Sequence, residues 1–196
     1  MRGELIAITG GIGAGKSVVS NILRLMGYDV YDCDSRAKNI INTDCNLKRD
    51  ICENICADAF FADGTYNHKA VSAQVFAEKA KMEMLNSLVH RAVFADINKW
   101  RQERSRESEN TLFVESAILY SSGLWREAKP NMAWIVTAPE DIRIQRVIRR
   151  NGLTEEQIRA RMAAQNFDPS AYPIPFRYIT NDDTTAVLPQ ILNLLQ

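Results

Sequence analysis

The feature that most constrains the fold of this 196-residue chain lies near its N-terminus, at residues 10–17. These eight residues read Gly-Gly-Ile-Gly-Ala-Gly-Lys-Ser, which has the G-x-x-x-x-G-K-S spacing of a phosphate-binding P-loop. An apolar run, residues 5–9, precedes them, and a helix-forming run, residues 18–26, follows them. Strand, glycine-rich turn and helix form the context in which this motif binds a nucleoside triphosphate. We therefore expect a triphosphate at this loop.

The residue types of the loop suit a polyphosphate ligand. Glycine permits the dihedral angles and the close approach that turn several N–H groups toward one anion. A helix that begins near Lys16 adds unpaired N–H groups and a positive dipole end. We expect Lys16 to neutralise charge on the β- and γ-phosphates and the Ser17 hydroxyl to ligate Mg²⁺. The loop residues assigned to the nucleotide are Gly11, Ile12, Gly13, Ala14, Gly15, Lys16, Ser17 and Val18.

Composition and charge argue against several classes of protein, namely nucleic-acid binders, membrane-surface binders and membrane-spanning proteins. The chain has 24 basic and 24 acidic side chains, which argues against a nucleic-acid or membrane-surface partner, because such binders are usually basic. Residues 1–4 lead directly into the first predicted strand, and no apolar run reaches membrane-spanning length. We therefore expect a cytoplasmic protein. Its four cysteines are expected as reduced thiols, because a chain with only two histidines and no second Cys pair does not indicate a zinc site.

Two aspartates, Asp32 and Asp34, follow the second predicted strand, residues 28–32. Acidic residues at the carboxyl end of a strand in a P-loop sheet face the crevice in which ligands bind. Asp34 is also a suitable N-cap for a helix that starts at Ser35. Capping accounts for one aspartate better than for two, so we predict a catalytic or Mg²⁺-linked role for at least one of them.

The remaining pattern predicts a three-layer α/β/α P-loop NTPase fold with about five parallel strands in one domain. The later strands are expected at residues 111–115, 133–137 and 178–181. The core is expected over about residues 1–45, 110–150 and 176–196. A helical insertion over about residues 46–109 is expected to bind the acceptor, and a helical lid is expected over about residues 143–168.

Charged residues in the second half of the chain add two features. Glu115 ends the predicted strand 111–115, where P-loop proteins often carry a Walker-B acid; it either orients a Mg²⁺-bound water or simply ends the strand. The helix that follows Pro139 presents Arg143, Arg146 and Arg150 on one face. Such a run is compatible with a solvated surface, but near a polyphosphate it favours stabilisation of a transferring phosphoryl group.

Three classes of P-loop protein remain to be separated. A GTPase switch needs Asp-x-x-Gly and Asn-Lys-x-Asp motifs, and the sequence contains neither. A motor ATPase needs a Walker-B Asp-Glu pair, which is also absent. A small-molecule kinase needs a P-loop, a carboxylate that accepts the hydroxyl proton, an acceptor-binding insertion and an arginine-bearing lid. We therefore predict a kinase with Asp34 as the base. The pattern leaves the acceptor open among nucleotides, shikimate-like alcohols and others, and a nucleoside monophosphate kinase or a non-catalytic nucleotide-binding module remains an alternative.

The chain resembles the dephospho-CoA kinase family. The resemblance rests first on residues 5–17, which are close to the family's hydrophobic-Thr-Gly-Gly-Ile-Gly-Ser-Gly-Lys-Ser opening, and on Asp32-Cys33-Asp34, which matches its Asp-Ala-Asp. Further matching positions span nearly the whole chain: Gly27, Asp63-Gly64-Thr65, Leu85-Asn86-x-Leu88-x-His90, Ser122-Gly123-Leu124, Gln145-Arg146, Arg150, Gln165 and Asn181.

The resemblance implies transfer of the ATP γ-phosphate to the ribose 3′-hydroxyl of dephospho-CoA, with ATP and Mg²⁺ required. It implies that Asp34 is the base, that Lys16 and Arg146 assist catalysis, and that Arg146 and Asn181 contact ATP. The residues that it assigns to the acceptor are Thr9, Asp34, Asn86 and His90, although pattern alone favours a surface or satisfied role for His90. The expected assembly is a monomer or a weak homo-oligomer.

Several positions depart from the family pattern. Val18 replaces a common Thr, and Arg91 replaces the Pro that usually follows the histidine. The segment that begins at Glu115 keeps its first acid, but its proline is lost and Ser121 replaces the later acid. The segment after Gln165 lacks the usual Lys and Ala-Asp pair. The resemblance is therefore closer on the ATP side than at the adenine and pantetheine contacts.

Overall fold

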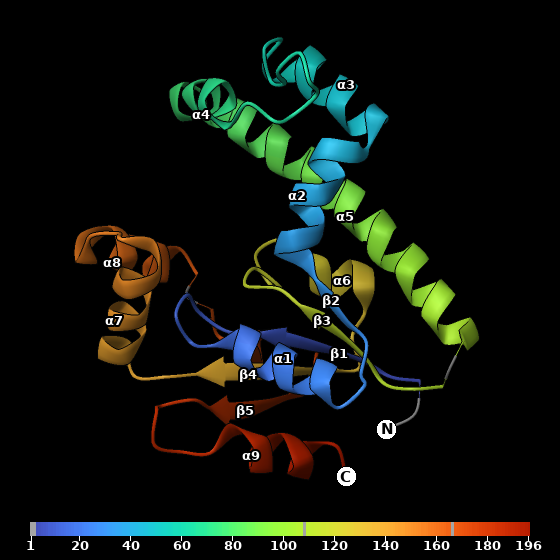
Figure 1. The fold of residues 1–196 in the computed structure, drawn as a ribbon, viewed down its shortest axis with the longest axis vertical. Helices are drawn as coiled ribbons and strands as arrows, with labels where there is room; N and C mark the ends of the chain where they lie inside the picture. The colour runs from blue at the N-terminus through green and yellow to red at the C-terminus, as the bar shows by residue number, and fades with distance from the viewer. Residues whose placement is uncertain (1–2, 108, 166) are drawn as a thin grey trace. The chain divides into compact units, whose positions relative to one another are not determined.

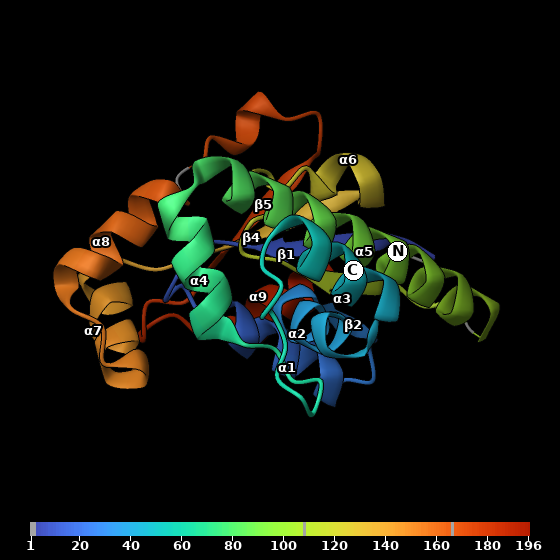
Figure 2. The same ribbon diagram turned by 90° about the horizontal axis from the view of Figure 1, so that it is seen from above.

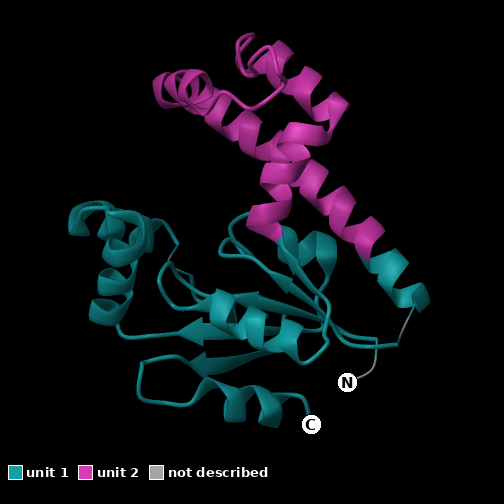
Figure 3. Cartoon of the chain, in the orientation of Figure 1, with its two compact units in different colours: residues 1–32, 101–196 teal, residues 33–100 magenta. Residues whose placement is uncertain are grey.

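The computed structural model describes residues 3–107, 109–165 and 167–196 (Figure 1). Its internal contacts divide the chain into two compact units (Figure 3). The first comprises residues 1–32 and 101–196, and the second comprises residues 33–100. We call the first the sheet unit and the second the helical unit.

A parallel sheet with the strand order β2-β3-β1-β4-β5 forms the centre of the sheet unit. Its strands are β1 (Leu5–Thr9), β2 (Val30–Asp32), β3 (Leu112–Glu115), β4 (Met132–Thr137) and β5 (Phe176–Thr180). Every residue of β1 is buried, which explains why its sequence is apolar on both faces instead of alternating. Parallel neighbours require crossover connections, and helices supply them.

Helices cover both faces of this sheet. In the sheet unit they are α1 (Lys16–Leu25), α6 (Leu124–Ala128), α7 (Glu140–Asn151), α8 (Glu155–Ala164), α9 (Val187–Leu194) and the end of α5 (Lys79–Glu107). Figure 2 shows α1 and α9 on one side of the strands and α6 on the other. The predicted three-layer α/β/α architecture with five parallel strands is therefore confirmed.

The core between the sheet, α1 and α9 is built from large apolar side chains. Trp134 of β4 and Phe113 of β3 are fully buried in this cluster, with ring centroids 5.2 Å apart. Leu23 of α1 and Ile191 of α9 pack into the same cluster. Because this core fixes the position of α1 against β1, it also fixes the loop that joins them.

The helical unit consists of α2 (Cys33–Thr43), α3 (Cys45–Asn54), α4 (His68–Ala77) and the greater part of α5. Arg36 of α2 and Asp96 of α5 form two hydrogen bonds of 2.8 Å that join these helices. Four apolar side chains in and after α3 are buried: Leu47, Ile51, Ile55 and Ala59. The unit spans residues 33–100, whereas the sequence placed the acceptor-binding insertion at about residues 46–109.

Local hydrogen bonds and charges fix the starts of two helices. A capping box opens α8, because the Thr154 side chain accepts from the Gln157 backbone and the Gln157 side chain accepts from the Thr154 backbone. The alternative in which Asp34 caps a helix starting at Ser35 does not hold, since α2 already begins at Cys33 and Asp34 lies inside its first turn. An acidic residue is favourable there because of the helix dipole.

The described residues lack two kinds of feature. None of their helices combines the length and apolar character that a membrane crossing requires. In the same residues, no three side chains of the His, Cys, Asp or Glu type are grouped as they would be around a metal ion.

Candidate active site

The P-loop (residues 10–17) joins β1 to α1 at the carboxyl edge of the sheet. Gly13 and Gly15 have φ angles of 79° and 93°. Residues that carry a side chain adopt such angles only with strain. A Cβ on Gly13 would lie 2.5 Å from the Arg143 carbonyl oxygen, and one on Gly15 would lie 1.9 Å from Asn181 Nδ2. Both glycines are therefore required by the backbone conformation and by the segments packed against the loop.

The first turn of α1 presents its N–H groups to the loop. Gly15 is the N-cap, and among the described residues no side chain caps this helix. A helix N-terminus without a side-chain cap is suited to bind an anion. Lys16 Nζ donates to the carbonyl oxygens of Gly10 at 2.8 Å and Gly11 at 3.3 Å. The ammonium group therefore lies across the beginning of the loop.

Two arginines of α7 bind the loop backbone. Arg143 Nε donates to the Ile12 carbonyl at 2.9 Å, and Arg146 Nη1 donates to the Gly13 carbonyl at 3.2 Å. Arg146 Nη2 also donates to Asp183 Oδ1 at 2.5 Å. Burial lowers the pKa of Arg143 from its ordinary value, but a guanidinium group keeps its charge at neutral pH. Two positive charges therefore lie beside the loop.

The third arginine of the predicted face does not reach the loop. Arg150 is exposed, and its Nε donates to Asn151 Oδ1 at 2.8 Å. The helical spacing that relates Arg143, Arg146 and Arg150 is correct, but α7 runs away from the loop toward its C-terminus.

Asn181 follows β5 and fastens the other side of the loop. Its side chain is buried, and Nδ2 donates to the Ala14 carbonyl at 3.0 Å. Its backbone carbonyl accepts from Arg146 Nη2 at 3.0 Å. The amide hydrogen of Asn181 is bound to the Thr137 carbonyl at 2.8 Å, which extends the ladder between β4 and β5. Asn181 therefore links the loop, α7 and the sheet.

Gln165 is a loop contact that the sequence assignment of site residues did not include. Its Oε1 accepts a hydrogen bond of 2.8 Å from the Ile12 amide. It ends α8, the second helix of the predicted lid, so the lid segment contacts the P-loop through this residue and through Arg143 and Arg146. The signals available in the sequence were the family position of Gln165 and the spacing of Arg143 one turn before Arg146.

A pair of carboxylates marks the carboxyl ends of β2 and β3. Asp32 and Glu115 are register partners on these adjacent parallel strands. The Ser20 hydroxyl of α1 donates to Glu115 Oε2 at 2.5 Å. Burial raises the pKa of Glu115 and the charge of Asp32 raises it further, while Ser20 acts in the opposite direction. Glu115 therefore joins β3 to the P-loop helix α1 through Ser20, and it lies beside a second carboxylate, Asp32, at the same edge of the sheet.

The predicted site residues divide between the two units. Those in the sheet unit, which the structure brings together around one loop, are Thr9, Gly11, Ile12, Gly13, Ala14, Gly15, Lys16, Ser17, Val18, Arg146 and Asn181. Asp34, Asn86 and His90 belong to the helical unit. On α5, Asn86 is exposed, and the half-buried His90 ring stacks on Phe94 with centroids 6.0 Å apart. Burial lowers the pKa of His90, so its imidazole is neutral at neutral pH.

Glu115→Gln should raise the free energy of unfolding at about pH 7. Because the folded state raises the pKa of this carboxyl, ionisation costs stability as pH rises from the ordinary glutamate pKa through the folded one. Glutamine removes the charge and keeps an oxygen that accepts from Ser20. Urea unfolding measures the difference in free energy of unfolding between Glu115→Gln and the wild type. This difference should favour the variant at about pH 7 and should be smaller at about pH 4.

The exposed Glu127→Gln on α6 is the matched control, with an expected change within about 0.5 kcal/mol. A wild type that is more stable than Glu115→Gln at the higher pH would contradict the assigned electrostatics.

The comparisons with known proteins agree with this geometry. The model of the dephospho-CoA kinase family matches residues 4–185. A dephospho-CoA kinase of Bacteroides fragilis is 33% identical over 190 residues, covering 97% of this chain and 90% of the relative. The crystal structure of a Thermus thermophilus protein has a TM-score of 0.75 and 29% identity, covering 100% of this chain and 97% of that one.

A further solved structure supports the fold. The dephospho-CoA kinase of Campylobacter jejuni has a TM-score of 0.70 at 20% identity, covering 98% of this chain and 95% of that one. With a family match over residues 4–185 and a relative that is 33% identical over almost the whole length, the chain belongs to the dephospho-CoA kinase family.

Proposed function

We propose that this protein transfers the γ-phosphoryl group of ATP to the 3′-hydroxyl of the ribose of dephospho-CoA, which gives coenzyme A and ADP in the final step of CoA biosynthesis. The observation that carries this proposal is the setting of the P-loop. Lys16 lies across the loop, and two arginines of α7 bind it from the side, in a chain of the dephospho-CoA kinase family.

The phosphate side of the reaction follows from the loop contacts. Lys16, Arg143 and Arg146 now donate to loop carbonyl oxygens. Phosphate oxygens carry full negative charge and are stronger acceptors for cationic donors than carbonyl oxygens. When ATP binds, these groups therefore turn toward its β- and γ-phosphates. They then stabilise the charge of the transferring phosphoryl group, which is the main work of a phosphoryl-transfer enzyme.

The acceptor side is assigned to the helical unit together with Thr9. Asp34 accepts the proton of the attacking 3′-hydroxyl, and Asn86 and His90 hold the acceptor. The neutral His90 imidazole both donates and accepts one hydrogen bond, which suits an uncharged part of the acceptor. Thr9 precedes the P-loop directly, and its buried Oγ1 has no hydrogen-bond partner within the described chain. A ligand contact would satisfy this hydroxyl.

The residues at the carboxyl edge also fit Mg²⁺. This ion is typically held by one or two carboxylates together with substrate phosphates and water. Ser17 supplies a hydroxyl, and the Asp32–Glu115 pair supplies carboxylates whose mutual repulsion contributes to the raised pKa of Glu115. Mg²⁺, when bound, neutralises charge on the β- and γ-phosphate oxygens. We assign Ser17 as its protein ligand and Glu115 as a group that positions it.

We assign residues of about 143–168 to a lid and the helical unit to acceptor binding. The lid contacts the P-loop through Arg143, Arg146 and Gln165. Closure of such a segment excludes water, which otherwise competes with the acceptor for the phosphoryl group. We further propose that the protein works in the cytoplasm as a monomer or weak homo-oligomer.

A coupled assay of ADP release tests the acceptor. Dephospho-CoA should give a kcat/KM at least about 100-fold above AMP, CMP or shikimate, since the acceptor's remote groups contribute binding energy to the reaction. Turnover with a nucleotide but none with dephospho-CoA would replace the proposal by a nucleoside monophosphate kinase. ATP binding with no turnover of any acceptor would indicate a nucleotide-binding module.

Asp34→Asn tests the base. We expect kcat to fall by roughly 10²–10⁴, the range for lost general-base catalysis, while the Kd for ATP stays near that of the wild type. Asp44→Asn is a matched control in the same unit, because Asp44 caps α3 and asparagine caps a helix equally well. An unchanged kcat in Asp34→Asn would remove this residue from the role.

A further inference from the structure

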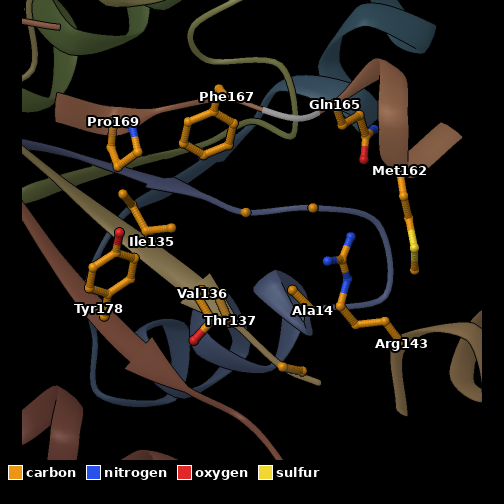
Figure 4. Close-up of a pocket in the computed structure, with 13 residues that line it drawn as sticks. Ala14, Ile135, Val136, Thr137, Arg143, Met162, Gln165, Phe167, Pro169 and Tyr178 are labelled. Carbon is orange, nitrogen blue, oxygen red and sulfur yellow. The ribbon is translucent and has the colours of Figure 1, made fainter. Parts of the chain in front are cut away.

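A cavity of about 240 Å³ lies beside the P-loop, wholly within the sheet unit (Figure 4). Its walls come from the loop, from β4 and β5, and from the segment that follows α8: Gly10, Gly11, Ile135, Tyr178, Phe167 and Pro169. A second cavity of about 80 Å³ shares Gln165 and Phe167 with the first. The two cavities are therefore neighbouring compartments, and Phe167 forms part of the wall of each.

The walls of both compartments combine polar and apolar groups, and some of the apolar side chains are open to solvent. Tyr178 of β5 is 54% exposed and Ile118 is 37% exposed. Tyr178 lines the larger compartment and Ile118 the smaller one. In Figure 4, Tyr178, Ile135, Phe167 and Pro169 surround one space. Burying these surfaces against a ligand would stabilise its binding.

Aromatic contacts hold the shared wall in place. The rings of Phe167 and Tyr120 lie 4.6 Å apart, and those of Tyr120 and Tyr172 lie 4.2 Å apart. The polar groups of the larger compartment include the Arg143 guanidinium, the Gln165 amide and the Thr137 hydroxyl. A site that combines apolar walls with such polar groups suits a small organic ligand that has both aliphatic and hydrogen-bonding parts.

The contacts of Lys16 indicate which end of the P-loop lies at this cavity. In a P-loop the lysine reaches the β- and γ-phosphates. Lys16 Nζ contacts Gly10 and Gly11, so these residues mark the γ-phosphate end of the loop. The same two residues line the cavity. The cavity therefore includes the γ-phosphate end of the loop, where the acceptor approaches, and it extends along the loop to Ala14, whose carbonyl Asn181 binds.

We propose that the two cavities bind the pantetheine arm of the acceptor. The inference rests on the proposed function, because it assigns the part of dephospho-CoA that does not react. This arm is a narrow chain with a branched aliphatic segment and two amides. Its aliphatic parts match the Tyr178 and Phe167 walls, and its amides match the isolated polar groups. Binding energy from this remote part of the acceptor would help to position its hydroxyl for reaction.

The test compares Tyr178→Ala and Phe167→Ala with the wild-type enzyme by calorimetric titration. The Kd for dephospho-CoA should rise roughly tenfold, as expected from the loss of part of an aromatic wall. The Kd values for ATP and for AMP, which contains the adenosine but lacks the arm, should change less than about twofold. Leu188→Ala on α9 is the control, because Leu188 is 47% exposed and lines neither cavity.

The remaining outcomes of the titration distinguish failure of the inference from failure of the proposed function. An unchanged Kd for dephospho-CoA in Tyr178→Ala overturns the inference, and this exposed position keeps the test valid if Phe167→Ala fails to fold. A rise in the Kd for ATP or AMP that matches the rise for dephospho-CoA also overturns it, because the cavity then holds adenosine or shapes the loop. A wild type that neither binds nor phosphorylates dephospho-CoA refutes the proposed function itself. A wild type that does both, with unaltered variants, refutes only the inference.

Discussion

The close approach of three segments to the P-loop is the constraint on which the rest of the sheet unit depends. Arg143 and Arg146 from α7 and Asn181 from the end of β5 each donate to a loop carbonyl. A Cβ at Gly13 or Gly15 would collide with these segments at 2.5 Å or less. The glycines therefore serve the fold as well as the ligand. Because these three contacts use carbonyl oxygens, they leave the loop N–H groups to face an anion, although the Ile12 amide donates to Gln165 and the Ala14 amide donates to the Gly11 carbonyl.

The charges at the loop are arranged in a way that suits phosphoryl transfer. Cationic groups gather on the loop, whereas the Asp32–Glu115 carboxylates stand at the ends of β2 and β3. Burial and like charge disfavour ionised Glu115, so this edge favours a cation between the carboxylates and the phosphates. The cavity beside Gly10 and Gly11 combines apolar and polar walls, and we propose that it holds a less charged part of the acceptor.

Much of this architecture could be predicted from the sequence, because its signals are local. The P-loop spacing, the apolar strands and the Thr154 capping box each depend on residues that are close in the chain. The contacts of Arg143 and Gln165 with Ile12 could not be predicted in the same way, because they join residues 131 and 153 positions apart. The start of α2 was misplaced because Asp34 is suited both to an N-cap and to a first turn, and sequence does not separate the two.

The donor side of the proposed reaction is built around one loop of the sheet unit, and we propose that Asp34 accepts the proton of the attacking hydroxyl. A crystal structure with a non-hydrolysable ATP analogue and dephospho-CoA tests this most directly. The account predicts an Asp34 carboxylate oxygen within about 2.6–3.2 Å of the ribose 3′-hydroxyl, which itself faces the γ-phosphorus. A different carboxylate at that hydroxyl, with Asp34 directed elsewhere, would contradict it.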